Sequence, residues 1–72
     1  MKANKLVIKR VEEERDELQK KVDALSAIVA GFNKNSYVTD PDKNLLIRQL
    51  VYMELYLNIL EVRLSLFEEE VE

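Results

Sequence analysis

The chain has 72 residues, of which 47% are hydrophobic and 35% are charged, and its formal net charge is -3. So short a chain buries only about 60% of its unfolded surface, so the core of a single copy is marginal. The chain has no cysteine and no histidine, which excludes disulfides, thiolate metal sites and the commonest general base. Self-association is therefore the expected source of stability, and the negative charge argues against nucleic acid as the main partner.

A first helix is predicted from about residue 4 to residue 30. Mostly apolar residues recur there at alternating spacings of three and four, which indicates a helix that packs along one narrow heptad stripe. The stripe comprises Ile8, Val11, Arg15, Leu18, Val22, Leu25, Val29 and Phe32. Arg15 is its only polar member. The basic residues of the first ten positions oppose the helix dipole, so we expect the first turn to fray. Gly31 stands where a left-handed residue commonly ends a helix.

A loop is predicted from residue 31 to residue 40, since Asn33, Asn35 and Ser36 favour turns. The residues that follow form a helix start signal. We expect the Asp40 side chain to accept a hydrogen bond from a free backbone N–H, and Pro41 suits the first helical position.

A second helix is predicted from about residue 41 to residue 71, and no segment shows the alternation of a strand. Its stripe repeats at spacings of four and three and comprises Leu46, Leu50, Met53, Leu57, Leu60, Leu64, Phe67 and Val71. Two helices of matched length joined by a short loop favour an antiparallel hairpin. The predicted fold class is all-α: residues 1–72 form a single coiled-coil-like two-helix hairpin.

The second helix carries further apolar residues beside its stripe: Leu45, Tyr52, Leu55, Ile59, Val62 and Leu66. One narrow partner helix cannot cover so wide a face. Burying a Leu or Ile side chain contributes roughly 1.5–3 kcal/mol, so leaving this face in water is unfavourable. We therefore expect a homo-oligomeric helical bundle with the second helix at its centre and the first helix outside.

Enzymatic chemistry is not expected. The acidic runs at residues 12–14 and 68–70 are interpreted as a solvated helix face and an acidic chain end. Without histidine or cysteine, they offer no metal-ligand constellation. The sequence therefore predicts no catalytic residue, no metal and no cofactor.

Basic and aromatic residues border the apolar face of the second helix, and these are the candidate ligand-binding residues: Arg48, Gln49, Tyr52, Tyr56 and Arg63. An arginine presents a planar donor fork that suits phosphate, and a tyrosine ring can stack on a base. Repeated across a symmetric interface, such a border predicts a pocket for a nucleotide-like anion. Alternatively, the tyrosines cover the edge of the core and the arginines pair with glutamates of the first helix. The same two interpretations apply to Lys34 and Tyr37 in the loop.

The chain resembles the small helical-hairpin proteins of tailed phages. The resemblance covers nearly the whole chain and rests on Arg10, Val11, Glu14, Glu17, Leu18, Lys21 and Leu25, and on Leu45, Leu46, Gln49, Leu50, Met53, Tyr56, Ile59, Leu60, Arg63 and Leu64. Proteins of this architecture include the signal sponges of anti-CBASS and anti-Thoeris systems, which assemble as homo-oligomers and sequester nucleotide-derived signals. The resemblance to these sponges is one of architecture, and no ligand-binding motif of theirs aligns with this sequence. It therefore implies a sequestering function by analogy of fold.

Two functions follow as hypotheses. The first is a phage-type homo-oligomer that sequesters a cyclic nucleotide or an ADP-ribose-derived immune signal without cleaving it. The alternative is a structural or interaction oligomer that binds a host or phage protein. No apolar run reaches the ~20 residues that span a bilayer, so we expect no membrane partner and a cytoplasmic location, in the host cell if the protein is phage-encoded.

Overall fold

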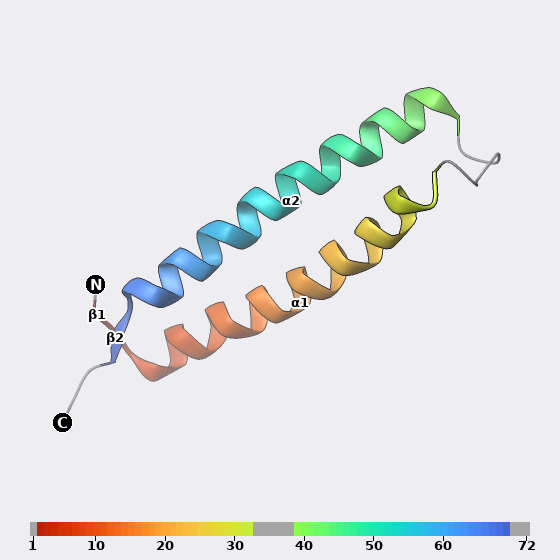
Figure 1. The fold of residues 1–72 in the computed structure, drawn as a ribbon. Helices are drawn as coiled ribbons and strands as arrows, with labels where there is room; N and C mark the ends of the chain where they lie inside the picture. The colour runs from red at the N-terminus through yellow and green to blue at the C-terminus, as the bar shows by residue number, and fades with distance from the viewer. Residues whose placement is uncertain (1, 33–38, 70–72) are drawn as a thin grey trace.

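Two long helices lie side by side and antiparallel in the computed structural model, which describes residues 2–32 and 39–69 (Figure 1). Helix α1 spans Lys5–Ala30 and helix α2 spans Asp40–Leu66. The all-α hairpin expected from the sequence is thus confirmed. The predicted loop residues 33–38, including Lys34 and Tyr37, and the predicted stripe residue Val71 lie outside the described residues.

Helix α1 begins with a side-chain cap. Asn4 has an extended backbone, and its Oδ1 accepts a hydrogen bond from the backbone N–H of Val7 at 2.9 Å. This bond satisfies one of the free N–H groups that every helix start leaves. The first turn, which the basic residues were expected to fray, is therefore helical from Lys5.

The end of α1 differs from the expectation. Gly31 has φ −88° and ψ 0°, so it is right-handed and not left-handed. Its N–H donates to the carbonyl oxygens of Ala27 and Ile28 at 3.2 and 3.0 Å, which continues the helical hydrogen bonding. Because the helix ends without a left-handed turn, this position does not need glycine for its backbone conformation.

Helix α2 begins one residue earlier and ends five residues earlier than predicted. Thr39 occupies the cap position that was assigned to Asp40, without a side-chain cap hydrogen bond. At the other end Phe67 is extended. A two-residue strand, β2 (Glu68–Glu69), follows it and pairs in parallel with β1 (Lys2–Ala3), an element that the sequence did not predict. Such a short strand shows no alternation, because its pairing depends on the hairpin bringing both chain ends together (Figure 1).

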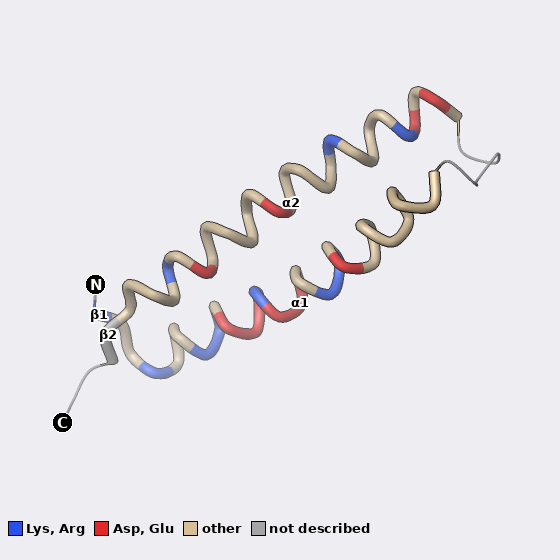
Figure 2. Tube along the Cα trace, viewed as in Figure 1, with Lys and Arg blue, Asp and Glu red and all other residues tan. Residues whose placement is uncertain are grey.

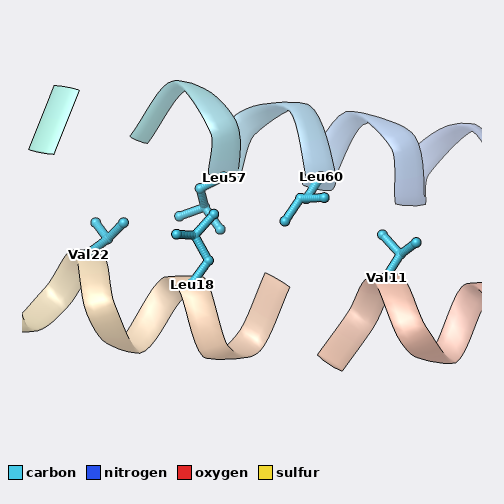
Figure 3. Close-up of a cluster of buried hydrophobic side chains, with 5 residues drawn as sticks. All are labelled: Val11, Leu18, Val22, Leu57 and Leu60. Atoms are coloured by element: carbon cyan, nitrogen blue, oxygen red, sulfur yellow. The ribbon is translucent and has the colours of Figure 1, made fainter. Parts of the chain in front are cut away.

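The core is the seam between α1 and α2. Val11, Leu18 and Val22 of α1 pack against Leu57 and Leu60 of α2 (Figure 3). Leu60 is completely buried, and each of the other four is at most 9% exposed. The predicted stripes therefore do face each other. Arg15, the polar member of the first stripe, forms an ion pair with Asp16, with Nε and Oδ1 3.0 Å apart.

The hairpin is a thin rod of 58 × 15 × 12 Å. It exposes 5775 Å², whereas a compact monomer of 8.5 kDa exposes about 4,650 Å² by the usual scaling of surface with mass. The excess arises because each helix has only one neighbour. Among the described residues, neither helix has a stretch long and apolar enough to cross a membrane.

Candidate ligand-binding surface on the second helix

The additional apolar residues of α2 lie on the face directed away from α1. Together with Arg48 they form what we call the outer row: Leu45, Arg48, Tyr52, Leu55, Ile59, Val62 and Leu66. Its six apolar members are 46% to 70% exposed. The sequence interpretation placed them beside the buried stripe, as one wide face. The structure corrects this, because they fall two heptad positions after the seam residues and so occupy the opposite side of the helix.

The outer row is itself a heptad stripe. Its members alternate at spacings of three and four from Leu45 to Leu66, as the seam residues do. A stripe with this spacing is typical of a helix that packs against another helix. Helix α2 therefore has two packing faces, and α1 covers only one of them. An exposed apolar stripe of this length marks an interaction surface.

A hollow of about 650 Å³ lies at the N-terminal half of the outer row, lined by Leu45, Arg48, Gln49, Tyr52, Met53 and Tyr56. Four of the five predicted ligand-binding residues meet here. All six belong to α2 and recur at helical spacing, which places them on one side of that helix. A second hollow, of about 380 Å³, also includes Arg48 and Tyr52 and is completed by Ile47 and Val51.

The charged and aromatic groups of the larger hollow are accessible. Arg48 is exposed, and the Tyr52 and Tyr56 side chains are 70% and 43% exposed. Among the side chains that the structure describes, no carboxylate lies within 4 Å of the Arg48 or Arg63 guanidinium. The ion pairs with glutamates of α1, considered as an alternative, are therefore not formed within the described part of the chain.

Arg63 does not line the hollow. It follows Arg48 by fifteen residues, which is about 22 Å along a helix at about 1.5 Å per residue. Its guanidinium carbon lies 5.8 Å from the centre of the Phe67 ring, within the range of a cation–π contact. Within one chain, Arg48 and Arg63 are thus too far apart to hold the same phosphate group.

Two lining residues, Leu45 and Met53, were not among the predicted site residues. Met53 packs against the buried cluster and also reaches the hollow. The Gln49 side-chain amide donates a weak hydrogen bond to Met53 Sδ at 3.8 Å. Helical spacing provides the missed signal, because Leu45 lies seven residues before Tyr52 and Met53 four residues after Gln49. Within residues 2–32 and 39–69, no three carboxylates are grouped as metal ligands.

The chain was also compared with known protein families. Residues 5–66 match the model of the Sequestin family. The chain belongs to the Sequestin family. The matched region runs from α1 to the end of α2 and contains the hollow, the outer row and Arg63. No curated protein matches the chain, and no solved structure does. The family name describes sequestration, which agrees with the coarser part of the sequence hypothesis, a small binding protein.

Proposed function

We propose that this Sequestin-family chain is a homo-oligomeric binding protein that sequesters a nucleotide-derived signal without cleaving it. The observation that carries the proposal is the hollow on α2. It combines an arginine without a carboxylate partner among the described side chains with two exposed tyrosine rings. The hollow has a volume of about 650 Å³ and is open, because one helix alone lines it, so a second surface is needed to enclose a ligand as small-molecule sites do.

Each group in the hollow has a role toward such a ligand. The Arg48 guanidinium offers charge-assisted hydrogen bonds to a phosphate. The flat face of Tyr56 offers stacking to a base, at roughly 1–3 kcal/mol per stacked ring. Tyr52 also belongs to the outer row and contributes the part of its ring that a second copy leaves uncovered. Leu45 and Met53 supply apolar contact beneath them. The sequence contains no histidine or cysteine to act as base or nucleophile, so the proposed outcome of binding is capture of an intact ligand.

The resemblance to phage signal sponges supports a phage origin and an immune signal as the target, either a cyclic nucleotide or an ADP-ribose-derived compound. The exposed outer row supports homo-oligomerisation, because an apolar stripe of this length is stable when another copy covers it. Stability matters for a protein that binds without turnover, since each ligand molecule occupies one folded binding site. Burial of this row between copies supplies the stability that one thin hairpin lacks.

The test is a calorimetric titration against a panel of cyclic dinucleotides and cyclic ADP-ribose derivatives. The wild-type protein should bind at least one member, and chromatography of the recovered ligand should show it unchanged. Arg48→Ala should weaken binding at least about tenfold, because a charge-assisted hydrogen bond contributes about 1.5–3 kcal/mol and 1.4 kcal/mol is one decade. Arg10→Ala is the matched control: it removes the same charge from an exposed position of α1 and should bind normally.

Failure of the wild-type protein to bind any member of the panel would overturn the proposal. It would favour the second candidate, a structural or interaction oligomer, which the outer row also suits because an amphipathic helix of another protein can dock on such a stripe. Recovery of a cleaved ligand would contradict the non-enzymatic part of the proposal.

A further inference from the structure

The outer row has nearly the same order of residue types read in either direction. Leu55 stands at its middle, Tyr52 and Ile59 flank it, and Leu45 and Leu66 end it. If two copies of α2 pack antiparallel about a two-fold axis at Leu55, each of these apolar residues meets an apolar residue of the other copy. Parallel packing would instead place the two Arg48 side chains against each other within the stripe.

The area of the outer row is sufficient for such a pair. An unfolded chain exposes about 1.45 Å² per dalton, or about 170 Å² per residue here. Seven residues that are about half exposed therefore offer about 600 Å² per subunit. Two subunits would bury about 1,200 Å², which reaches the lower bound of roughly 1,200–2,000 Å² for a stable interface.

The same pairing brings distant arginines together. With Leu55 on the axis, Arg48 of one subunit lies level with residues 62 and 63 of the other. Gln49, Tyr56 and Arg63 recur every seven residues along one border of the outer row, whereas Val51 and Asn58 lie along the other. In an antiparallel pair like borders face each other, so Arg63 of the partner subunit comes beside Arg48 and Gln49. Among the described residues of α2, Asp42 is the carboxylate on that border. It lies six residues, about 9 Å, before Arg48, so no carboxylate stands between the two cations.

We infer that a second copy of this chain packs antiparallel on the outer row. Leu45 and Tyr52 then lie in the interface, and the part of the hollow that Arg48, Gln49 and Tyr56 line remains at its edge as an anion site. Each dimer then holds two equivalent anion sites, with Arg48 from one subunit and Arg63 from the other. Two guanidinium groups on one side of a hollow suit a ligand with at least two negative charges, that is, a diphosphate or a pair of phosphates. The identity of this ligand as a nucleotide rests on the proposed function, whereas the shared anion site does not.

The geometry is testable by cross-linking, because the chain contains no cysteine. A disulfide requires Cα atoms about 4.4–6.8 Å apart. Under mild oxidation Leu55→Cys should form a covalent dimer by itself. Tyr52→Cys and Ile59→Cys should each stay monomeric on a denaturing gel, but a mixture of the two should form a dimer. Glu54→Cys, one residue away but directed away from the outer row by its heptad position, is the control and should not cross-link.

Cross-linking of Tyr52→Cys alone, as efficient as that of Leu55→Cys, would show parallel packing and overturn the inference. Absence of any cross-link from Leu55→Cys would overturn it as well. Neither result tests whether a single hairpin binds nucleotides, which the titration described above measures separately. Failure of the antiparallel dimer is therefore distinguishable from failure of the proposed function.

The shared site is testable by mixing subunits, with inorganic pyrophosphate as the probe. Arg48→Ala and Arg63→Ala should each bind pyrophosphate at least about tenfold more weakly than the wild-type protein. After subunit exchange, an equal mixture should regain about a quarter of the wild-type sites, since half of the dimers are mixed and each carries one intact site. Arg10→Ala should behave as wild type.

Wild-type affinity of Arg63→Ala, or no recovery in the mixture, would overturn the shared site. Recovery in the mixture together with no binding of any nucleotide by the wild-type protein would instead support the site and remove the proposed function. A purely structural role of Arg63 would not change the affinity for pyrophosphate. Sedimentation of all variants checks that they form the same oligomeric species.

Discussion

The two helices share one seam but differ on their outer faces. In α1 charged residues follow one another up to Asp23, whereas in α2 single charged residues are separated by uncharged stretches from residue 44 onward (Figure 2). The difference is sharpest at equivalent heptad positions. The outward positions of α1 hold Arg10, Glu13, Glu17, Lys20, Ala24 and Ala27, and those of α2 hold the outer row. All of these positions are exposed in the hairpin.

The contrast shows that the two helices meet different packing requirements within one small fold. Helix α1 needs only to bury one stripe, so its other positions are free to carry charge and keep the surface hydrated. Helix α2 buries one stripe and leaves a second apolar stripe uncovered, which is unfavourable for an isolated hairpin. We therefore expect another helix to cover this stripe, which is the second copy proposed above.

The largest effect should come from the seam that both helices share. Leu60 is fully buried against α1, so Leu60→Ala should lower the free energy of unfolding by about 2–5 kcal/mol. Ile28→Ala is the control, since Ile28 lies on α1 but is 50% exposed, and it should change stability by only about 0.5 kcal/mol. Chemical denaturation monitored by circular dichroism measures both. Equal losses for the two variants would mean that the seam is wrongly placed.

The second effect concerns the outer face of α2 alone. Leu55→Glu places a charge in the middle of the outer row and should raise the dissociation constant of the assembly at least tenfold, measured by sedimentation. Glu17→Lys changes an outward position of α1 and should leave association unchanged. A wild-type protein that sediments as a folded monomer at micromolar concentration would refute the interpretation of the outer row.

A smaller difference is expected at the helix starts. Asn4 caps α1 through a hydrogen bond to Val7 N–H, whereas Thr39 makes no such bond at the start of α2. Asn4→Ala should therefore lower stability by about 1 kcal/mol, and Thr39→Ala should cost clearly less. The comparison of the two thermal melts checks this. A larger loss for Thr39→Ala would show that the cap of α2, and not that of α1, stabilises the hairpin.

The smallest effect is expected at the end of α1. Gly31 has negative φ, and a Cβ there would lie 3.5 and 3.7 Å from the nearest carbonyl oxygens, an ordinary contact distance. Gly31→Ala should therefore raise stability by about 0.4–1 kcal/mol, because alanine has less conformational freedom to lose on folding. A loss of stability would instead indicate the left-handed conformation that the sequence suggested.

Much of the hairpin is predictable from spacing alone. Val11, Leu18, Val22, Leu57 and Leu60 all belong to the predicted stripes, because the heptad period determines which side of a helix is apolar. Four members of the candidate site, Arg48, Gln49, Tyr52 and Tyr56, were also identified from their positions on α2 and meet in one hollow. The helix ends were less predictable: the conformation of Gly31, the role of Thr39 and the early end of α2 depend on local backbone choices that several residue types permit.

The sequence by itself determined that two helices form and which stripe of each is buried, since those properties follow from the local period of apolar residues. Only the tertiary structure decided that α1 leaves the outer row of α2 exposed, that Met53 serves both the core and the hollow, and that Lys2–Ala3 pairs with Glu68–Glu69. The physical reason is that these properties depend on how far α1 reaches around α2 and where the two chain ends meet, and each is a relation between segments that are distant in the chain.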